Sequence, residues 1–357
     1  MRRTDTLILG GGPAGSAAAI TLARTGARPL LLERQREMGD ALCGGFLSWH
    51  SLAALERLGI DGLTGAQVSH LRLFARTGEA RARLPRAALG ISRRQLDSVL
   101  MAQAERLGTL IERGTTVRDV MGTRTRTDQG DVTAERLLLA TGKHDVRGLA
   151  RPRNSADPAL GLRVRLGPST ALTRLAAGAI ELHLFDRGYA GLVLQEDGTA
   201  NLCLAVRKSR VAEAGTPLAL LLAIGNELPA LGERLAWLSQ TAEIDAIAAV
   251  PYGWRTATTR PGVFRLGDQA GVIPSLAGEG MGIALSSGAL AANAVADGWT
   301  AERYQRELHH RTRRPILVAR TILAAAERPA TAQLLVSFGR SAPVLATLLA
   351  RVTRVAH

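Results

Sequence analysis

Residues 6–15 of the chain read TLILGGGPAG, and this stretch decides how the fold begins. A short apolar run ends at three glycines, Gly10, Gly12 and Gly15, and a run of small residues follows them. A strand that breaks into a glycine turn and then a helix is typical of dinucleotide binding, because the N–H groups at the helix start receive a pyrophosphate. The alternative is a glycine-rich loop that serves packing alone.

The three glycines have different expected roles. Gly10 permits a tight turn, Gly12 leaves the backbone open to the phosphates, and Gly15 lets the helix pack closely on the sheet. A second apolar run ends at Glu33, whose carboxylate is placed to accept hydrogen bonds from a ribose diol. Glu33 would repel a 2′-phosphate and so disfavours NADP here, although Arg34 offsets part of that repulsion.

Length and composition are those of a globular protein. The 357 residues are 46% hydrophobic and 21% charged, which is enough for a large core and two interlocked domains. No apolar run reaches the ~20 residues of a membrane span, and the first strand begins too near Met1 for a signal peptide, so we expect a cytoplasmic protein. The two cysteines, Cys43 and Cys203, and seven scattered histidines have no metal-ligand spacing, so we expect no metal site. Cys203 lies in an alternating run and is expected in the core.

The net charge is +14, and half of it falls in residues 301–357, with ten Arg against three Glu. Aromatic residues are only 3% of the chain, which disfavours nucleic acid as the partner. A solvated helical surface explains the charge, and the alternative is peripheral contact with an anionic membrane or an acidic carrier protein. The chain also has an apolar stripe at helical spacing near its C-terminus, which is expected either to dock on the protein body or to contact a membrane. Its residues are Val344, Leu345, Leu348, Leu349, Val352 and Val355.

Hydrophobic periodicity predicts an α/β fold whose nucleotide-binding segments are separated along the chain. We expect a Rossmann-type three-layer domain, interrupted by an antiparallel β-sheet substrate domain and followed by a helical C-terminus. Prolines at 315, 329 and 343 are expected to divide the C-terminal helices. The nucleotide-binding domain is assigned to 1–66, 93–158 and 259–300, the substrate domain to 67–92 and 159–258, and the helical region to 301–357.

A second glycine-rich stretch, residues 266–282, reads LGDQAGVIPSLAGEGMG. Asp268 follows an apolar strand and can accept a hydrogen bond from a sugar-alcohol hydroxyl. The glycines that open the next helix leave N–H groups bare, and a helix N-terminus there would stabilise negative charge on a reduced ring system. An ordinary strand–loop–helix turn is the alternative. The presence of this stretch together with the distant glycine-rich stretch at residues 6–15 favours a cofactor site.

Three segments together resemble the flavoprotein superfamily with the p-hydroxybenzoate hydroxylase fold: residues 10–15 with Glu33, residues 93–97 (RRQLD), and residues 267–282. The resemblance covers essentially residues 1–300 and implies an FAD-binding domain. It implies that Arg93, rather than Arg94, reaches the phosphate and ribose, while Asp97 caps or pairs locally. The implied FAD-binding residues are Gly10, Gly12, Pro13, Ala14, Gly15, Glu33, Arg34, Cys43, Gly44, Arg93, Gly267, Asp268, Pro274, Gly278, Gly280, Met281 and Gly282.

Within that superfamily, residues 43–45 (CGG) resemble the geranylgeranyl reductase branch. Residues 188–192 lie where that branch has G-Y-x-W, but Gly191 replaces the tryptophan and opens space over the ring. Residues 198–204 resemble small flavoproteins encoded beside polyketide or lipid-quinone genes, some of which hydroxylate alkylresorcinol-type phenols.

The resemblance implies two reactions on a lipophilic small molecule. The favoured one is monooxygenation of a phenolic or polyketide-derived substrate through a flavin C4a-hydroperoxide. The alternative is hydride transfer that saturates isoprenoid or other C=C bonds. Halogenation is disfavoured because no W-x-W-x-I-P motif is present.

Candidate catalytic side chains are Cys43, His50 and Tyr189, and Trp49 is a further candidate for substrate contact; each also fits ordinary packing. No second glycine fingerprint is found for NAD(P)H, so the reductant either docks transiently or is replaced by a protein electron donor. The sequence does not set the oligomeric state.

Overall fold

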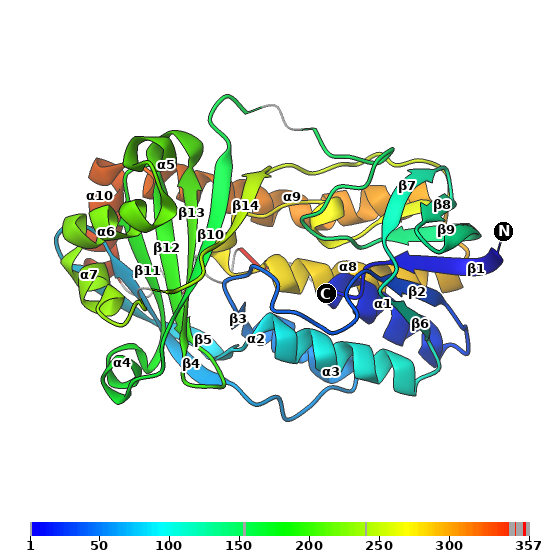
Figure 1. The fold of residues 1–357 in the computed structure, drawn as a ribbon, viewed down its shortest axis with the longest axis horizontal. Helices are drawn as coiled ribbons and strands as arrows, with labels where there is room; N and C mark the ends of the chain where they lie inside the picture. The colour runs from blue at the N-terminus through cyan, green and yellow to red at the C-terminus, as the bar shows by residue number, and fades with distance from the viewer. Residues whose placement is uncertain (1, 153–154, 240, 343–346, 348–352, 355–357) are drawn as a thin grey trace.

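The computed structural model describes residues 2–152, 155–239, 241–342, 347, 353 and 354. Two sheets lie toward opposite ends of the longest axis of the molecule (Figure 1). Helix α9 (Ala301–Ala326) connects them: it contacts β15 (Val263–Arg265) of the first sheet, and its end packs on the second. The apolar stripe predicted at residues 344–355 lies outside the described residues.

The first sheet has a parallel core, and the apolar runs of its central strands, Leu7–Leu9 and Leu30–Leu32, are buried, with alternate residues in two different apolar clusters. β1 pairs in parallel with β2 and β9, β6 joins β2, and β15 joins β9. β7 and β8 extend the first half of β9 as an antiparallel hairpin. The strand bounds, in sheet order, are β6 (Leu110–Arg113), β2 (Leu30–Glu33), β1 (Arg2–Leu9), β9 (Gly130–Leu139), β8 (Arg124–Thr127) and β7 (Val117–Met121).

Small residues bring two helices close together beside this sheet. α1 (Pro13–Arg24) packs on α8 (Gly280–Ala296) and on α3 (Arg93–Arg106). A Cβ added at Gly288 would lie 2.2 Å from the Ala14 carbonyl oxygen, so a side chain at this crossing would force the helices apart. The Rossmann-type layers of the sequence prediction are confirmed.

The second sheet is mainly antiparallel, as expected, and contains one parallel pair. β11 runs parallel to β4, and the other neighbours are antiparallel. β4 and β11 can run in parallel because a long stretch of chain, which builds much of the first sheet, separates them. The strand bounds, in sheet order, are β14 (Asp245–Val250), β10 (Ala159–Leu166), β13 (Ala200–Arg207), β12 (Gly188–Leu194), β11 (Gly178–Phe185), β4 (Ala66–Phe74), β5 (Glu79–Gly90) and β3 (Phe46–Leu47).

Serine and threonine side chains cap the start of several helices. Ser48, Ser92 and Thr216 each accept a hydrogen bond from a first-turn N–H of α2, α3 and α6. Pro315 lies inside α9 and does not end it, contrary to expectation, because the buried residues that follow it keep the helix packed. The helices whose bounds have not yet been given are α2 (Trp49–Arg57), α4 (Thr170–Ala176), α5 (Lys208–Ala214), α6 (Pro217–Glu227), α7 (Pro229–Leu235) and α10 (Pro329–Ser341).

Candidate active site

A cavity of about 760 Å³ lies where the two sheets meet. Residues that follow β1, β2 and β9 line one part of it, at the carboxyl ends of the parallel strands, where α/β sheets bind their ligands. Side chains from β4, β5 and β11 line another part. One space is therefore continuous from the glycine turn to the second sheet.

The first glycine turn is built as the sequence predicted. Gly10 has a φ of 101°, and a Cβ there would lie 2.7 Å from the Ala140 carbonyl oxygen, so only glycine fits. Gly12 is the N-cap of α1 and has no capping side chain, so the first N–H groups of that helix remain for an anionic ligand. A Cβ at Gly15 would lie 1.9 Å from the carbonyl oxygen of Gly10, which assigns Gly15 to packing.

The two charged residues expected beside this turn both line the cavity. Glu33 is buried, and its carboxylate accepts hydrogen bonds from Gly11 N at 2.7 Å and Gln35 N at 2.9 Å, with capacity left for hydroxyl donors. Arg93 is held by Asp97 through Nη2 at 2.7 Å, whereas Arg94 is exposed. Burial opposes the charge on Arg93, but Asp97 outweighs it and the pKa of Arg93 is raised.

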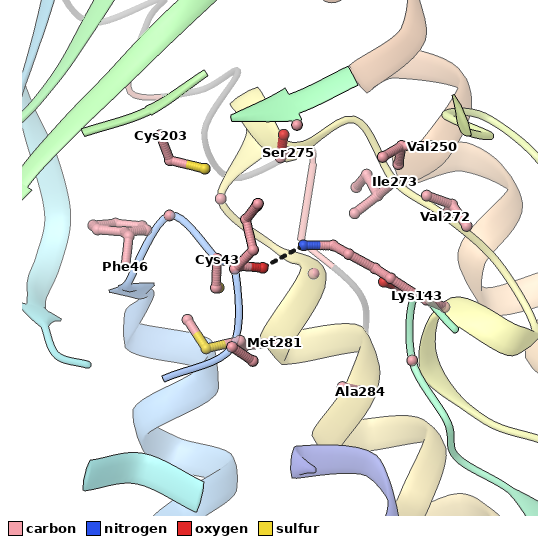
Figure 2. Close-up of a pocket in the computed structure, with 18 of the residues that line it drawn as sticks. Cys43, Phe46, Lys143, Cys203, Val250, Val272, Ile273, Ser275, Met281 and Ala284 are labelled. Atoms are coloured by element: carbon pink, nitrogen blue, oxygen red, sulfur yellow. Dashed lines mark hydrogen bonds between the residues drawn. The ribbon is translucent and has the colours of Figure 1, made fainter. Parts of the chain in front are cut away.

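A buried arginine fixes the loops that follow β9 and β15. Arg151 donates to Asp145 at 2.7 Å, to the Lys143 carbonyl at 2.7 Å and to the Asp268 carbonyl at 3.0 Å. Lys143 then extends across the cavity and donates to the Leu42 carbonyl at 2.6 Å (Figure 2). These contacts hold Asp268 on the cavity wall.

The second glycine stretch forms the turn before α8. Gly278 has a φ of 62° and, with Gly280 and Met281, lines the cavity. A Cβ at Gly280 would meet no heavy atom within 4 Å, so the space beside this helix start is open. The N-cap residue of α8, Glu279, makes no capping bond, so this helix also presents bare N–H groups.

These features fit FAD. One uncapped helix start and a buried carboxylate suit the pyrophosphate and ribose, and a second uncapped helix start with open space suits the ring. Of the FAD ligands predicted from sequence, all but three line the cavity. Gly15 packs α1 on its turn, Pro274 is buried, and a Cβ at Gly282 would meet Glu279 at 2.5 Å, so these three do not line the cavity.

Of the four side chains that the sequence suggests for catalysis or substrate contact, two line the cavity and two do not. Cys43 and Tyr189 line the cavity; Trp49 and His50 do not. Those two begin α2, with ring centroids 5.8 Å apart, and Trp49 packs in a small apolar cluster. The pKa of His50 is lowered, mainly because the ring is partly buried.

Cys203 is half-buried and faces the cavity, as does Cys43 (Figure 2), so its expected place in the core is wrong. Burial raises the pKa of Cys203 to about 11. Gly191, one strand away on β12, also lines the cavity, and a Cβ there would come no closer than 3.6 Å to a neighbour.

Three hydroxyl groups meet on the cavity wall. Ser275 Oγ lies 2.5 Å from the Tyr189 hydroxyl and 2.8 Å from the Tyr252 hydroxyl. Burial raises the pKa of both tyrosines, so both remain protonated near neutral pH. Ser275 is the exposed member of this hydroxyl cluster, defined as Tyr189, Ser275 and Tyr252.

The rest of the cavity near the second sheet is apolar. Its wall includes side chains of β4, β5, β11, α9 and α10, among them Leu73, Leu84, Ile180, Leu182, Ile322 and Leu335. Phe338 on α10 also lines the cavity and is 53% exposed, so the cavity reaches the molecular surface there.

Sequence reasoning missed Lys143, Ser275, Tyr252 and Arg354, all of which line the cavity. Lys143 could have been found, because it follows the apolar strand 136–140 at the edge where ligands bind. Ser275, Tyr252 and Arg354 have no local pattern, since their meeting depends on distant segments.

The fold and the features of this cavity fit a protein that binds FAD. Residues 3–148 match the family model described as "FAD binding domain". No helix among the described residues is long and apolar enough to cross a membrane. Those residues also contain no group of three or more His, Cys, Asp or Glu side chains placed to hold a metal ion.

The chain is also similar to individual proteins and solved structures over most of its length. The chain is 25% identical to digeranylgeranylglycerophospholipid reductase 2 of Methanopyrus kandleri, over 82% of this chain and 77% of that protein. It is 27% identical to menaquinone reductase of Mycolicibacterium smegmatis, over 83% and 77%. Among solved structures, a geranylgeranyl bacteriochlorophyll reductase-like protein from Thermoplasma acidophilum has a TM-score of 0.75 at 19% identity, covering 98% of this chain and 96% of that one. A flavin-dependent brominase has a TM-score of 0.74 at 16% identity, covering 98% and 93%.

Proposed function

We propose that the protein reduces carbon–carbon double bonds in a long, lipophilic, isoprenoid-type substrate. The observation that carries the proposal is the continuity of the cavity from the glycine turns to the apolar wall of the second sheet. A long apolar chain would enter past Phe338 and lie against Leu73, Ile180 and Leu335, which bury it from water. The names of the two sequence relatives support a reductase.

Bound FAD would supply a hydride to one carbon of the double bond. Gly10, Gly12, Glu33 and Arg93 would hold its nucleotide half, and the turn before α8 would hold its ring. Reduction of the bond also requires one proton at the second carbon. The hydroxyl cluster is the proton source in this proposal: Ser275 donates to the substrate while a tyrosine O–H donates to Ser275.

Hydroxylation of a lipophilic phenol, the activity favoured by the sequence alone, is the second candidate. The hydroxyl cluster supports it as well, because three O–H groups beside an apolar wall can bind a phenolic oxygen. The two activities differ in their need for oxygen. Transient use of NAD(P)H as reductant is proposed for either.

A half-reaction separates the candidates. The holoprotein is reduced with one equivalent of dithionite under anaerobic conditions and mixed with a polyprenyl lipid or with a long-chain alkylphenol. We expect flavin reoxidation with the polyprenyl lipid and a product two hydrogens heavier by mass spectrometry. Oxygen-dependent turnover of the phenol, with no anaerobic reoxidation by any alkene, would contradict the reductase proposal.

The proton donor has its own test. Ser275→Ala should slow the anaerobic half-reaction by about 10²-fold, which is the usual contribution of a general acid. Ser286→Ala on α8 is the matched control, because Ser286 bonds only its own helix, at the Ile283 carbonyl, and does not line the cavity. Equal rates in the two variants would remove Ser275 from the mechanism.

A further inference from the structure

Residues near the C-terminus reach into the cavity. Thr353 and Arg354 are buried and line it, although they lie far along the chain from both glycine turns. Thr347, a few residues earlier, donates to the Arg83 carbonyl on β5 at 2.9 Å. Thr347 therefore contacts the second sheet, and Arg354 contacts the segment that begins α8.

Arg354 makes most of these contacts. Its side chain is 5% exposed, and Nη1 donates to the Ala277 carbonyl at 3.1 Å and to the Gly278 carbonyl at 3.0 Å. The same nitrogen pairs with the Glu279 carboxylate, and the guanidinium lies 4.7 Å from the centroid of the Trp49 ring. One arginine thus contacts each residue of the turn that precedes α8.

Glu279 is the reason a cation is needed there. Its side chain is fully buried, and Ser48 Oγ donates to Oε2 at 3.1 Å. A buried carboxylate without a cation is strongly destabilising, and the described contacts give this one Arg354. Its neighbours on either side, Gly278 and Gly280, line the cavity, so the charge lies just behind the wall expected to face the cofactor ring.

One donor of Arg354 remains. Its Nε is buried and has no hydrogen-bond partner among the described residues. Buried N–H groups in proteins are nearly always satisfied, so an unsatisfied one on a cavity wall indicates a bound group.

We propose that Arg354 is a positioning residue of the active site: it neutralises Glu279, sets the Ala277–Glu279 turn, and keeps Nε for a molecule bound in the cavity. The proposal rests on the function proposed above, in that FAD occupies this cavity. Thr353 and Arg354 then belong to the cofactor site.

The positive charge of Arg354 has a measurable effect on the cofactor. Arg354→Gln removes the positive charge of Arg354 from beside the Glu279 carboxylate, so negative charge added to the ring on reduction becomes less favourable. We expect a more negative midpoint potential for bound FAD and about tenfold weaker FAD binding. Glu279→Gln in the same chain removes the carboxylate charge and should return the potential toward that of the parent.

The experiment compares Arg354→Gln, Arg354→Lys, Glu279→Gln and the double variant with the parent. Midpoint potential is measured by dye-coupled reduction, FAD affinity by quenching of flavin fluorescence, and near-UV circular dichroism of the FAD-free protein reports on Trp49. Arg354→Lys keeps the charge but not the planar donor set, so its potential should stay near that of the parent while FAD binding weakens. Arg340→Gln, on the exposed side of α10, is the matched control and should behave as the parent.

Two results would overturn the proposal. One is an Arg354→Gln protein with the potential and affinity of the Arg340→Gln control. The other is a shift in potential that Glu279→Gln does not reverse. These outcomes require a protein that binds FAD, so they are distinct from failure of the proposed function, in which the parent itself binds no FAD or reduces no alkene.

Discussion

At the residue scale, the glycines of the two turns divide into those that pack and those that face the cavity. A Cβ at Gly15 would overlap a backbone oxygen, so substitution there should unfold the turn. At Gly12 the nearest atom to an added Cβ is the flexible end of Arg93 at 3.3 Å, and at Gly280 nothing lies within 4 Å. Side chains at Gly12 and Gly280 can therefore be tolerated by the fold while they fill the site.

The two cysteines allow a second test at this scale. Because burial raises the pKa of Cys203 to about 11, its thiolate is scarce at pH 8, and alkylation by iodoacetamide should be at least about a hundredfold slower than for a free thiol. Mass spectrometry of the Cys43→Ser variant measures Cys203 alone, with the denatured chain as the control. The rate should keep rising with pH beyond pH 9. A rate that levels off near pH 8 would contradict this assignment.

At the element scale, a buried charged network joins β4, β11 and α7. Glu181, fully buried on β11, accepts hydrogen bonds from Arg72 Nη1 at 2.6 Å and from Arg234 Nε and Nη2 at 2.9 Å. His183 lies beside it at 3.2 Å and stacks on Phe74. These side chains lie away from the cavity lining and tie the parallel strand pair to a covering helix.

This network predicts how stability depends on pH. Burial opposes the Glu181 charge, but hydrogen bonds from His183 and Arg234 outweigh it and lower the pKa of Glu181 to about 2. Burial lowers the pKa of His183. Both groups bind protons more weakly in the folded chain, so the unfolding free energy should fall as pH drops below 6.5 and again from about 4.5 toward 2.

Urea unfolding between pH 3 and pH 8 measures this dependence. Glu181→Gln should lower the unfolding free energy at pH 7 by about 3 kcal/mol, because it removes the buried anion that Arg72 and Arg234 share, and should flatten the slope below pH 4.5. Glu213→Gln is the control, since Glu213 pairs with Arg187 at the surface. Identical pH profiles for the two variants would refute the role of the network.

Some features of the fold and of the site could be predicted from the sequence, and others could not. The strand–glycine–helix start, α3 and its Arg93–Asp97 pair were predictable, because their signals are local and periodic. The parallel pairing of β4 with β11 and the antiparallel pairing of β3 with β5 were not, because pairing between strands that are distant along the chain leaves no local pattern. The hydroxyl cluster and the Arg354–Glu279 pair were missed for the same reason: each joins segments that meet only in the folded chain.

At the scale of the whole molecule, neither sheet contains the site alone. The cavity has a part beside the first sheet that is expected to bind the nucleotide, and an apolar part beside the second sheet. Gly278 and Gly280, from the turn before α8, line its wall. The boundaries assigned to the two domains, a cytoplasmic location, and contact with a membrane surface or acidic carrier protein stay predictions. The stripe on which that contact would depend lies outside the described residues.

The central claim is that both glycine turns face one FAD molecule. The most direct measurement is a fluorescence titration of FAD into Gly12→Glu, Gly280→Glu and the control Gly167→Glu, with melting temperatures recorded for each. Gly167 is exposed and does not line the cavity, and a Cβ there meets nothing within 4 Å. The account predicts that Gly12→Glu and Gly280→Glu stay folded and lose FAD binding while Gly167→Glu keeps it. Unchanged FAD affinity in a folded Gly12→Glu or Gly280→Glu protein would contradict it.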